Sequence, residues 1–318
     1  MARRSLEGFA RLAGATTVVT LVLVALVGTV RATNSGLACP TYPGCFGFWD
    51  FLPPADVNVW LEHSHRLLAG VVGFMILGLA VWAVARFRDR GDLVWPAVGA
   101  LLAVGVQAAL GAFVVLRQLM AELVTAHLGM SMAVVALLAL LTVNARREPG
   151  PRAALDPAGR RLARTSAAVA ALTYLQILVG GHVSGVGAGL AFVDRPWLGV
   201  VALGPIERDI DAWNVAHRVL AVVVVVAIGV LVRAARGQAG WLRLLPHIAS
   251  GLVVLQVLLG VANLWTGLSF LTVIPHLAVA SWIWTALVLH AILARDGGAP
   301  RRDREPAAPE PALALGGR

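Results

Sequence analysis

Long apolar segments separated by short polar connections run through most of the chain. Eight of these segments have about 20 residues each, the length that an α-helix needs to cross the hydrocarbon core of a bilayer. The first segment is longer than the apolar part of a signal peptide and no clear cleavage site follows it, so we count it as a span. The pattern predicts an all-α polytopic membrane protein with eight transmembrane helices. The predicted spans are 9–30, 65–86, 93–116, 122–144, 162–183, 213–233, 241–263 and 270–294.

The charged residues add a topology to this prediction. The chain is 58% hydrophobic and 14% charged, and arginine supplies all the basic residues behind its formal net charge of +9. The arginines cluster at both ends and in every second connection, which is the positive-inside pattern. Both termini are therefore predicted to be cytoplasmic, and the charge indicates a membrane rather than a nucleic acid as partner. The clusters fall within residues 3–11, 86–90, 146–164, 233–243 and 295–304.

A repeat with an offset of 149–153 residues relates the two halves of the chain. It predicts two tandem, pseudo-symmetric four-helix bundles, related by an axis along the membrane normal. The predicted halves are 1–150 and 151–295, and the tail 296–318, rich in Pro, Ala and charge, is predicted to be disordered. The matching positions are Gly36-Leu37-Ala38 with Gly189-Leu190-Ala191, His65-Arg66 with His217-Arg218, Gln107 and Gly111 with Gln256 and Gly260, and His127-Leu128 with His276-Leu277.

Four of the eight histidines occupy repeat-equivalent positions. His65 and His217 begin spans 2 and 6, whereas His127 and His276 lie about a turn and a half inside spans 4 and 8. Two imidazoles per half, at similar depth in the outer leaflet, suit bis-imidazole ligation of haem iron. Zinc or copper would need three or four converging donors. The other histidines have no repeat counterpart and are predicted to be structural; they are His63, His182, His247 and His290.

An arginine follows the first histidine of each pair. Arg66 and Arg218 would lie at the outer membrane boundary, where a guanidinium group can extend towards lipid headgroups. The same group suits the carboxylate of a haem propionate, because its planar fork can donate two parallel hydrogen bonds. The repetition of the arginine favours the propionate role.

The two halves differ at positions that carry chemistry. Glu62 corresponds to Asn214 and shares a helix face with His65, so its carboxylate could hold a proton beside a haem; the alternative is an interfacial Glu facing water. Cys39 and Cys45 lie in the first outer loop, whose counterpart has Phe192 and no cysteine. Disulfides persist on this side of the membrane. The pair is either a structural staple or a redox-active dithiol, and the half with Glu62 is predicted to be the reactive one.

These motifs together resemble those of the bacterial haem A synthase family. The resemblance covers roughly residues 10–294, and it rests on GLACPTYPGC in the first outer loop, EHSHR in span 2, TAHLG in span 4, AHR in span 6 and IPHL in span 8. It implies an oxidoreductase of the bacterial cell membrane that oxidises a ring methyl of haem O to a formyl group. The product, haem A, would supply cytochrome oxidase.

The resemblance also implies roles for the histidines. His65 and His127 would hold the substrate haem O, with Glu62 as the neighbouring acid, and His217 and His276 would bind haem b as a fixed cofactor. Candidate protein partners are a haem O synthase, cytochrome oxidase assembly factors and a second copy of the chain. Two other functions explain the histidines: a diheme electron-transfer cytochrome and a non-catalytic haem carrier. A transporter fits less well, because the polar residues lie at the outer edge.

Overall fold

The computed structural model describes residues 2–42, 44–47, 52–147, 154–192 and 208–297. Within these residues the secondary structure is helical, with no strand, and eight helices are long and apolar enough to cross a membrane. The all-α prediction with eight spans is therefore confirmed. The predicted tail lies outside the described residues from 298 onward. The helices are α1 (Ala2–Ala32), α2 (Val57–Arg86), α3 (Gly91–Leu116), α4 (Ala121–Ala145), α5 (Pro157–Gly185), α6 (Asp209–Ala234), α7 (Gly240–Trp265) and α8 (Phe270–Arg295), with a 3₁₀ turn η1 (Ala188–Leu190) after α5.

Helix α2 begins about two turns before its predicted span, and helix α6 begins about one turn before its predicted span. Asp56 caps α2 by accepting hydrogen bonds from the backbone N–H groups of Asn58 and Val59, so the helix starts in the polar connection. His65 consequently lies eight residues after Val57 instead of beginning its helix, and the prediction that it begins the span was wrong. His217 lies equally far into α6, and the other two repeat-equivalent histidines lie six residues into α4 and α8. At about 1.5 Å per residue, the four imidazoles are at similar depth along their helices.

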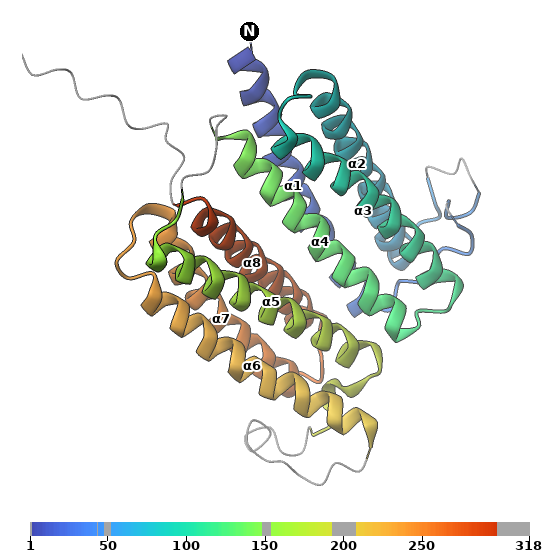
Figure 1. The fold of residues 1–318 in the computed structure, drawn as a ribbon. Coiled ribbons are helices and arrows are strands. Elements are labelled where there is room, and N and C mark those ends of the chain that lie inside the picture. Colours follow the sequence, from blue (N-terminus) through green and yellow to red (C-terminus); the bar gives the residue numbers. More distant parts are fainter. Residues whose placement is uncertain (1, 43, 48–51, 148–153, 193–207, 298–318) are drawn as a thin grey trace, which may run out of the picture.

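The helices pack as two rings of four (Figure 1). In the first ring α1 and α3 each contact both α2 and α4, and in the second ring α5 and α7 each contact both α6 and α8. Helices α2 and α4 therefore occupy opposite corners of their ring, as α6 and α8 do in theirs. The rings meet through α4 against α5, α1 against α8, and α4 against α8. The repeat-equivalent helices α4 and α8 thus lie together at the centre.

Two contacts between the rings are reciprocal. A methyl group on Gly28 of α1 would lie 2.9 Å from Leu277 of α8, and a methyl group on Gly181 of α5 would lie 2.8 Å from Leu128 of α4. The two glycines are 153 residues apart and the two leucines 149, which are the offsets of the sequence repeat. A two-fold relation between the halves requires such exchanged contacts. They support the predicted pseudo-symmetry, and they align α1 with α5 residue by residue.

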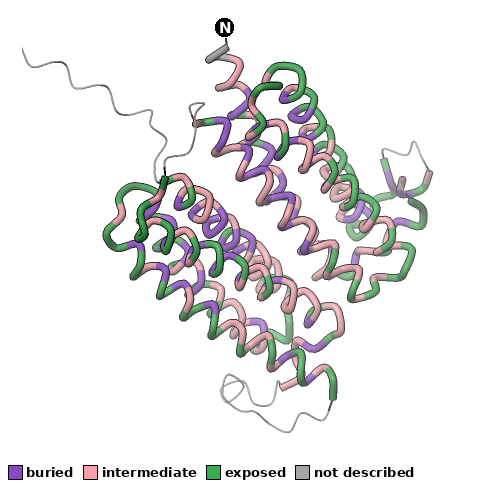
Figure 2. The backbone as a smooth tube through the Cα atoms, viewed as in Figure 1, coloured by how far each residue is buried: buried purple, intermediate pink, exposed green. Residues whose placement is uncertain are grey.

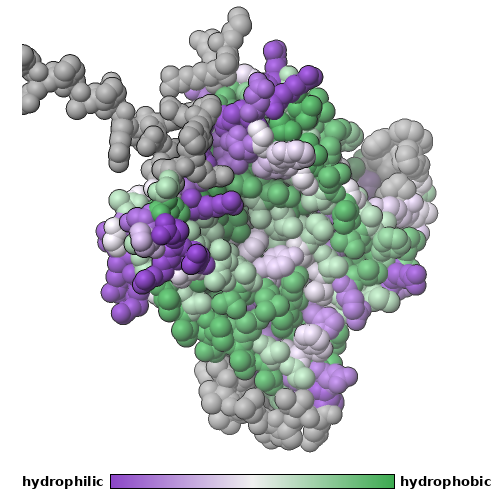
Figure 3. All heavy atoms as spheres, viewed as in Figure 1, coloured by the Kyte–Doolittle hydropathy of each residue, from purple (hydrophilic) through white to green (hydrophobic). Residues whose placement is uncertain are grey.

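Burial divides the helices into inner and outer faces (Figure 2). Most buried apolar residues gather in two clusters, one centred on α1–α4 and the other on α5–α8 with parts of α1 and α4, and a small third cluster joins the disulfide to Val59 of α2. Large apolar residues such as Phe74, Leu102 and Val226 are exposed on the outside. Figure 3 shows hydrophobic residues over the middle of the visible face and hydrophilic residues gathered towards its ends. This distribution suits a surface surrounded by lipid.

Candidate functional site

The four repeat-equivalent histidines form two facing pairs. His65 of α2 interacts electrostatically with His127 of α4, and His217 of α6 interacts in the same way with His276 of α8. Each pair joins opposite corners of one helix ring, and all four side chains are partly buried. The fold therefore brings together the two histidines that the sequence predicts as a pair in each half. Such a pair can approach a flat group from both sides.

Three of the four imidazoles lie against a glycine of the preceding helix. A methyl group would lie 3.1 Å from His127 Cε1 if placed on Gly111, and 3.4 Å from His276 Cε1 if placed on Gly260. On Gly180 it would lie 2.8 Å from His217 Cε1. The repeat analysis used Gly111 and Gly260 only as markers and missed Gly180. A search for a Gln four residues before a Gly would have found all three, since each has one.

Several buried polar atoms beside these histidines have no hydrogen-bond partner among the described residues. They belong to the glutamines of the preceding helices and to one arginine, and they are Gln107 Oε1, Gln176 Oε1, Gln256 Oε1 and Arg218 Nη2. Buried polar groups are normally paired, so the surroundings of the histidines can accept a polar ligand. Over the same described residues, no group of three or more His, Cys, Asp or Glu could hold a bare metal ion. The donor set fits haem, which needs only two protein ligands.

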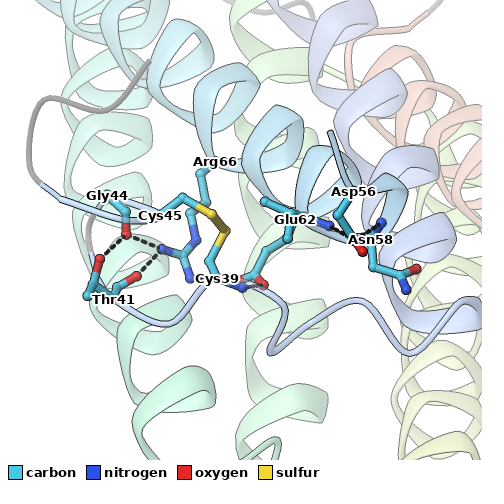
Figure 4. The surroundings of a disulfide bond; sticks show 9 residues. Cys39, Thr41, Gly44, Cys45, Asp56, Asn58, Glu62 and Arg66 are labelled. Atoms are coloured by element: carbon cyan, nitrogen blue, oxygen red, sulfur yellow. Dashed lines mark hydrogen bonds and ion pairs between the residues drawn. A yellow bond between two sulfur atoms is a disulfide. The ribbon is translucent and has the colours of Figure 1, made fainter. Parts of the chain in front are cut away.

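Arg66 ties the disulfide loop to α2 (Figure 4). Its guanidinium group forms an ion pair with Glu62 and donates hydrogen bonds to the carbonyl oxygens of Thr41 (2.7 Å) and Gly44 (2.9 Å). It also lies 5.3 Å from the centre of the Tyr42 ring. Arg66 thus has loop partners that the sequence did not indicate, and its role towards a propionate stays a prediction.

Arg218 has a different environment from its repeat counterpart. Its guanidinium carbon lies 5.8 Å from the centre of the Phe192 ring, at the position where the first half has Cys39. No carbonyl oxygen of the described loop residues is recorded as its hydrogen-bond partner, and its Nη2 atom is buried without one. Of the two arginines, Arg218 therefore has the more open donor for an anionic group.

Glu62 is buried, with 3% of its surface exposed. Its carboxylate accepts a hydrogen bond from the backbone N–H of Cys39 (2.8 Å) as well as the ion pair from Arg66. The alternative of a Glu facing water is therefore wrong. Asn214 anchors the corresponding loop by donating to the carbonyl oxygen of Ala188 (2.6 Å). Both residues anchor the loop before their helix, Glu62 as a charged acceptor of a backbone N–H and Asn214 as a neutral donor to a backbone carbonyl oxygen. Catalysis by Glu62 stays a prediction.

Cys39 and Cys45 are joined by a disulfide bond, with their Cα atoms 4.5 Å apart. Both cysteines are buried, and the Thr41 N–H donates to the Cys45 carbonyl oxygen across the loop. The bond agrees with the staple interpretation, while redox activity of the pair stays an open alternative. Most of the corresponding loop, residues 193–207, lies outside the described residues.

The four remaining histidines have contacts of a structural kind. His63 and His182 pack against tryptophan rings, and His247 and His290 each lie within hydrogen-bond distance of a backbone carbonyl oxygen. His290 is fully buried. The contacts agree with the prediction that these residues are structural. The partners are Trp60, Trp213, Arg243 and Leu242, respectively.

A comparison with protein-family models matches residues 52–288 to the family described as cytochrome oxidase assembly protein. The chain belongs to this family. The matched region includes Glu62, both histidine pairs and both arginines, whereas the disulfide loop precedes it. Membership and the eight apolar helices together make the chain a multi-pass membrane protein.

Relatives within this family carry the name haem A synthase. The one from Halalkalibacterium halodurans is 30% identical over 297 residues, which cover 89% of this chain and 95% of that relative. The one from Rhizorhabdus wittichii is 27% identical, with 85% of this chain and 89% of the relative covered. The one from Exiguobacterium sibiricum is 32% identical over 208 residues, or 64% of this chain and 67% of the relative.

Proposed function

We propose that the chain is an enzyme of the haem A synthase type, which oxidises a ring methyl group of haem O to a formyl group. The observation that carries the proposal is that each half of the chain contains one histidine pair. The same chain aligns with a haem A synthase over 95% of that relative's length. A diheme cytochrome or a haem carrier would also need the pairs. Neither accounts for relatives that are named as synthases.

The two pairs are assigned different haems. His65 and His127 hold the substrate haem O, and His217 and His276 hold haem b. When bound, haem b supplies a path for electrons leaving the substrate. The open Nη2 donor of Arg218 supports a propionate at the second site, and Arg66 is the corresponding candidate at the first.

Glu62 is the proposed proton acceptor at the first site. Converting a methyl to a formyl group removes electrons and protons and adds one oxygen atom, so a group near the substrate must receive protons. Glu62 lies one turn before His65 on the same helix face. The ion pair with Arg66 and the hydrogen bond from the Cys39 N–H together fix the position of its carboxylate. Asn214, its counterpart, has no carboxylate, which supports assigning the reaction to the first half.

The orientation in the membrane is also part of the proposal. Both termini are cytoplasmic, in the bacterial cell membrane, and both haem sites lie towards the outer leaflet. Arg147, after α4, forms an ion pair with Asp296, after α8 (2.9 Å). This contact supports placing the C-terminal ends of α4 and α8 on the same side of the membrane. The disulfide loop precedes α2 at the opposite ends of the helices, where an oxidising environment preserves it. A haem O synthase and cytochrome oxidase assembly factors are the proposed protein partners.

The test is production of the chain in a bacterial host that makes haem O and no haem A. Haems extracted from the purified protein are separated by chromatography and identified by mass. We expect haem A from the wild type, and loss of bound haem b from His217→Ala. His182→Ala, at a histidine packed against Trp213, is the matched control and should retain haem b. Bound haem that never acquires a formyl group would contradict the synthase and leave the cytochrome or the carrier.

A further inference from the structure

For three of the four paired histidines, the preceding helix carries a Gln followed four residues later by a Gly. Helix α3 presents such a pair to the histidine of α4, α5 to that of α6, and α7 to that of α8. Residues four apart share a helix face, so the Gln and the Gly both face the imidazole. We call each such pair a cradle. The cradles are Gln107–Gly111 for His127, Gln176–Gly180 for His217, and Gln256–Gly260 for His276.

The glycine of each cradle makes room for the ring. A Cβ atom on Gly180 would lie 2.8 Å from His217 Cε1, closer than any ordinary contact, and the distances at the other two cradles are 3.1 Å and 3.4 Å. An alanine at Gly180 would push the ring away from the helix backbone, whereas at Gly260 its methyl group would only reach ordinary contact. The lack of a side chain on the glycine thus lets the imidazole ring lie close to the helix backbone.

At two of the three cradles the glutamine side chain contacts the ring. Gln107 Nε2 lies 3.1 Å from His127 Nε2 and donates to Ser131 Oγ (2.6 Å), and Ser131 donates to the His127 carbonyl oxygen. Gln176 Nε2 lies 3.1 Å from His217 Nδ1 and donates to the carbonyl oxygen of the same residue. At the third cradle the contact that the structure gives is that of Gly260 with the His276 ring. At the first two, the glutamine holds one ring nitrogen and leaves the other for iron, which is Nδ1 in His127 and Nε2 in His217.

His65 has no cradle. The helix that precedes it is α1, and the 153-residue offset that pairs Gly28 with Gly181 places Leu23 and Val27 where α5 has Gln176 and Gly180. Neither residue can act as its counterpart does, because Leu has no polar group and Val is branched at Cβ. Among the described residues, neither ring nitrogen of His65 has a recorded hydrogen-bond partner.

We propose that the cradles are positioning devices and that His65 is the exchangeable ligand of the first site. This inference rests on the proposed function, in which the first site must release its product while the second must keep its cofactor. The second site has two oriented ligands and retains its haem. The first site holds haem through His127 and opens on the side of His65, because an unrestrained imidazole loses more conformational freedom on binding.

The test measures haem loss, which does not depend on turnover. Protein purified from a host that makes haem O and haem b is mixed with excess apomyoglobin as a haem scavenger, and the haems left on the protein are identified by mass over time. We expect farnesylated haem to leave first and haem b to stay. His65→Ala should keep haem at the first site with a high-spin optical spectrum, whereas His127→Ala should lose it.

Two sets of variants move the rates in opposite directions. Leu23→Gln with Val27→Gly installs a cradle on α1 and should slow the loss of farnesylated haem by about tenfold. Gly180→Ala should speed the loss of haem b by a similar factor, while Gly251→Ala, on α7 with open space around it, should not. Gln176→Leu repeats the test at the same ligand without adding bulk.

The outcomes separate this inference from the proposed reaction. Equal loss rates for the two sites in the wild type, or an unchanged first-site rate after the cradle is installed, would overturn the exchangeable role of His65. Retention of haem b in both Gly180→Ala and Gln176→Leu would overturn the positioning role of the cradles. The expected loss pattern without any haem A would uphold the inference and contradict the synthase activity.

Discussion

Glu62 and Arg66, one helical turn apart on α2, form an ion pair that also holds the disulfide loop against the helix. The two residues flank His65, the first of the paired histidines, along α2. One carboxylate oxygen of Glu62 pairs with the Arg66 guanidinium group, and the other accepts a hydrogen bond from the Cys39 N–H. Contacts with α2 therefore connect the disulfide loop to Glu62 and Arg66, next to the candidate iron ligand His65. In the second half, Asn214 makes the loop contact without the charge.

Replacing Arg66 with Gln should destabilise the protein more than replacing Arg218 with Gln. The first change leaves Glu62 buried without its ion-pair partner, at a cost of about 3–5 kcal/mol. Arg218 has a buried Nη2 with no hydrogen-bond partner to lose. Thermal unfolding of the two variants in detergent gives the comparison. Equal melting temperatures would show that the ion pair does not stabilise the fold.

Removing the disulfide by Cys39→Ser with Cys45→Ser should lower the free energy of unfolding by about 2 kcal/mol. The loop should also become more open to proteolysis, because the Cys39 N–H that Glu62 accepts is no longer held in place. Limited proteolysis and thermal unfolding measure the two effects. A double variant with wild-type stability but no haem A would favour redox activity of the cysteines over the staple.

Glu62→Gln should lower haem A formation by about 100-fold or more, the range for loss of a general acid–base group. The amide oxygen can still accept from the Cys39 N–H, so the haem content of the protein should change little. Extracted haems and the haem-to-protein ratio give both values. Wild-type haem A formation by this variant would leave Glu62 with the loop-anchoring role alone.

Trp284→Phe should weaken the contact between the two halves. The indole N–H of Trp284 on α8 donates to the Met132 carbonyl oxygen on α4 (3.0 Å), and its ring lies against Tyr174 of α5. Loss of this bond should cost about 0.5–1 kcal/mol, measured by thermal unfolding. Trp282→Phe on the same helix is the control, since Trp282 is 49% exposed. An equal effect of the two changes would contradict the interface role.

Some features follow from local pattern and could be predicted. The eight spans come from segment length and apolarity, because the bilayer imposes one length on every helix. The four paired histidines came from the repeat, which marks equivalent places without any knowledge of packing. The matches to the cytochrome oxidase assembly family and to a haem A synthase agree with the family that the sequence motifs resemble.

The sequence by itself thus determined the helices, the repeat and the residues that carry the chemistry. Only the tertiary structure decided what those residues touch: that Arg66 binds a loop, that Glu62 is buried, and that a glycine of the preceding helix lies against three of the paired histidines. The reason is that each of these contacts joins segments from different parts of the chain. A period along one helix records which face is apolar, but the partner of a side chain depends on how neighbouring helices are placed against it.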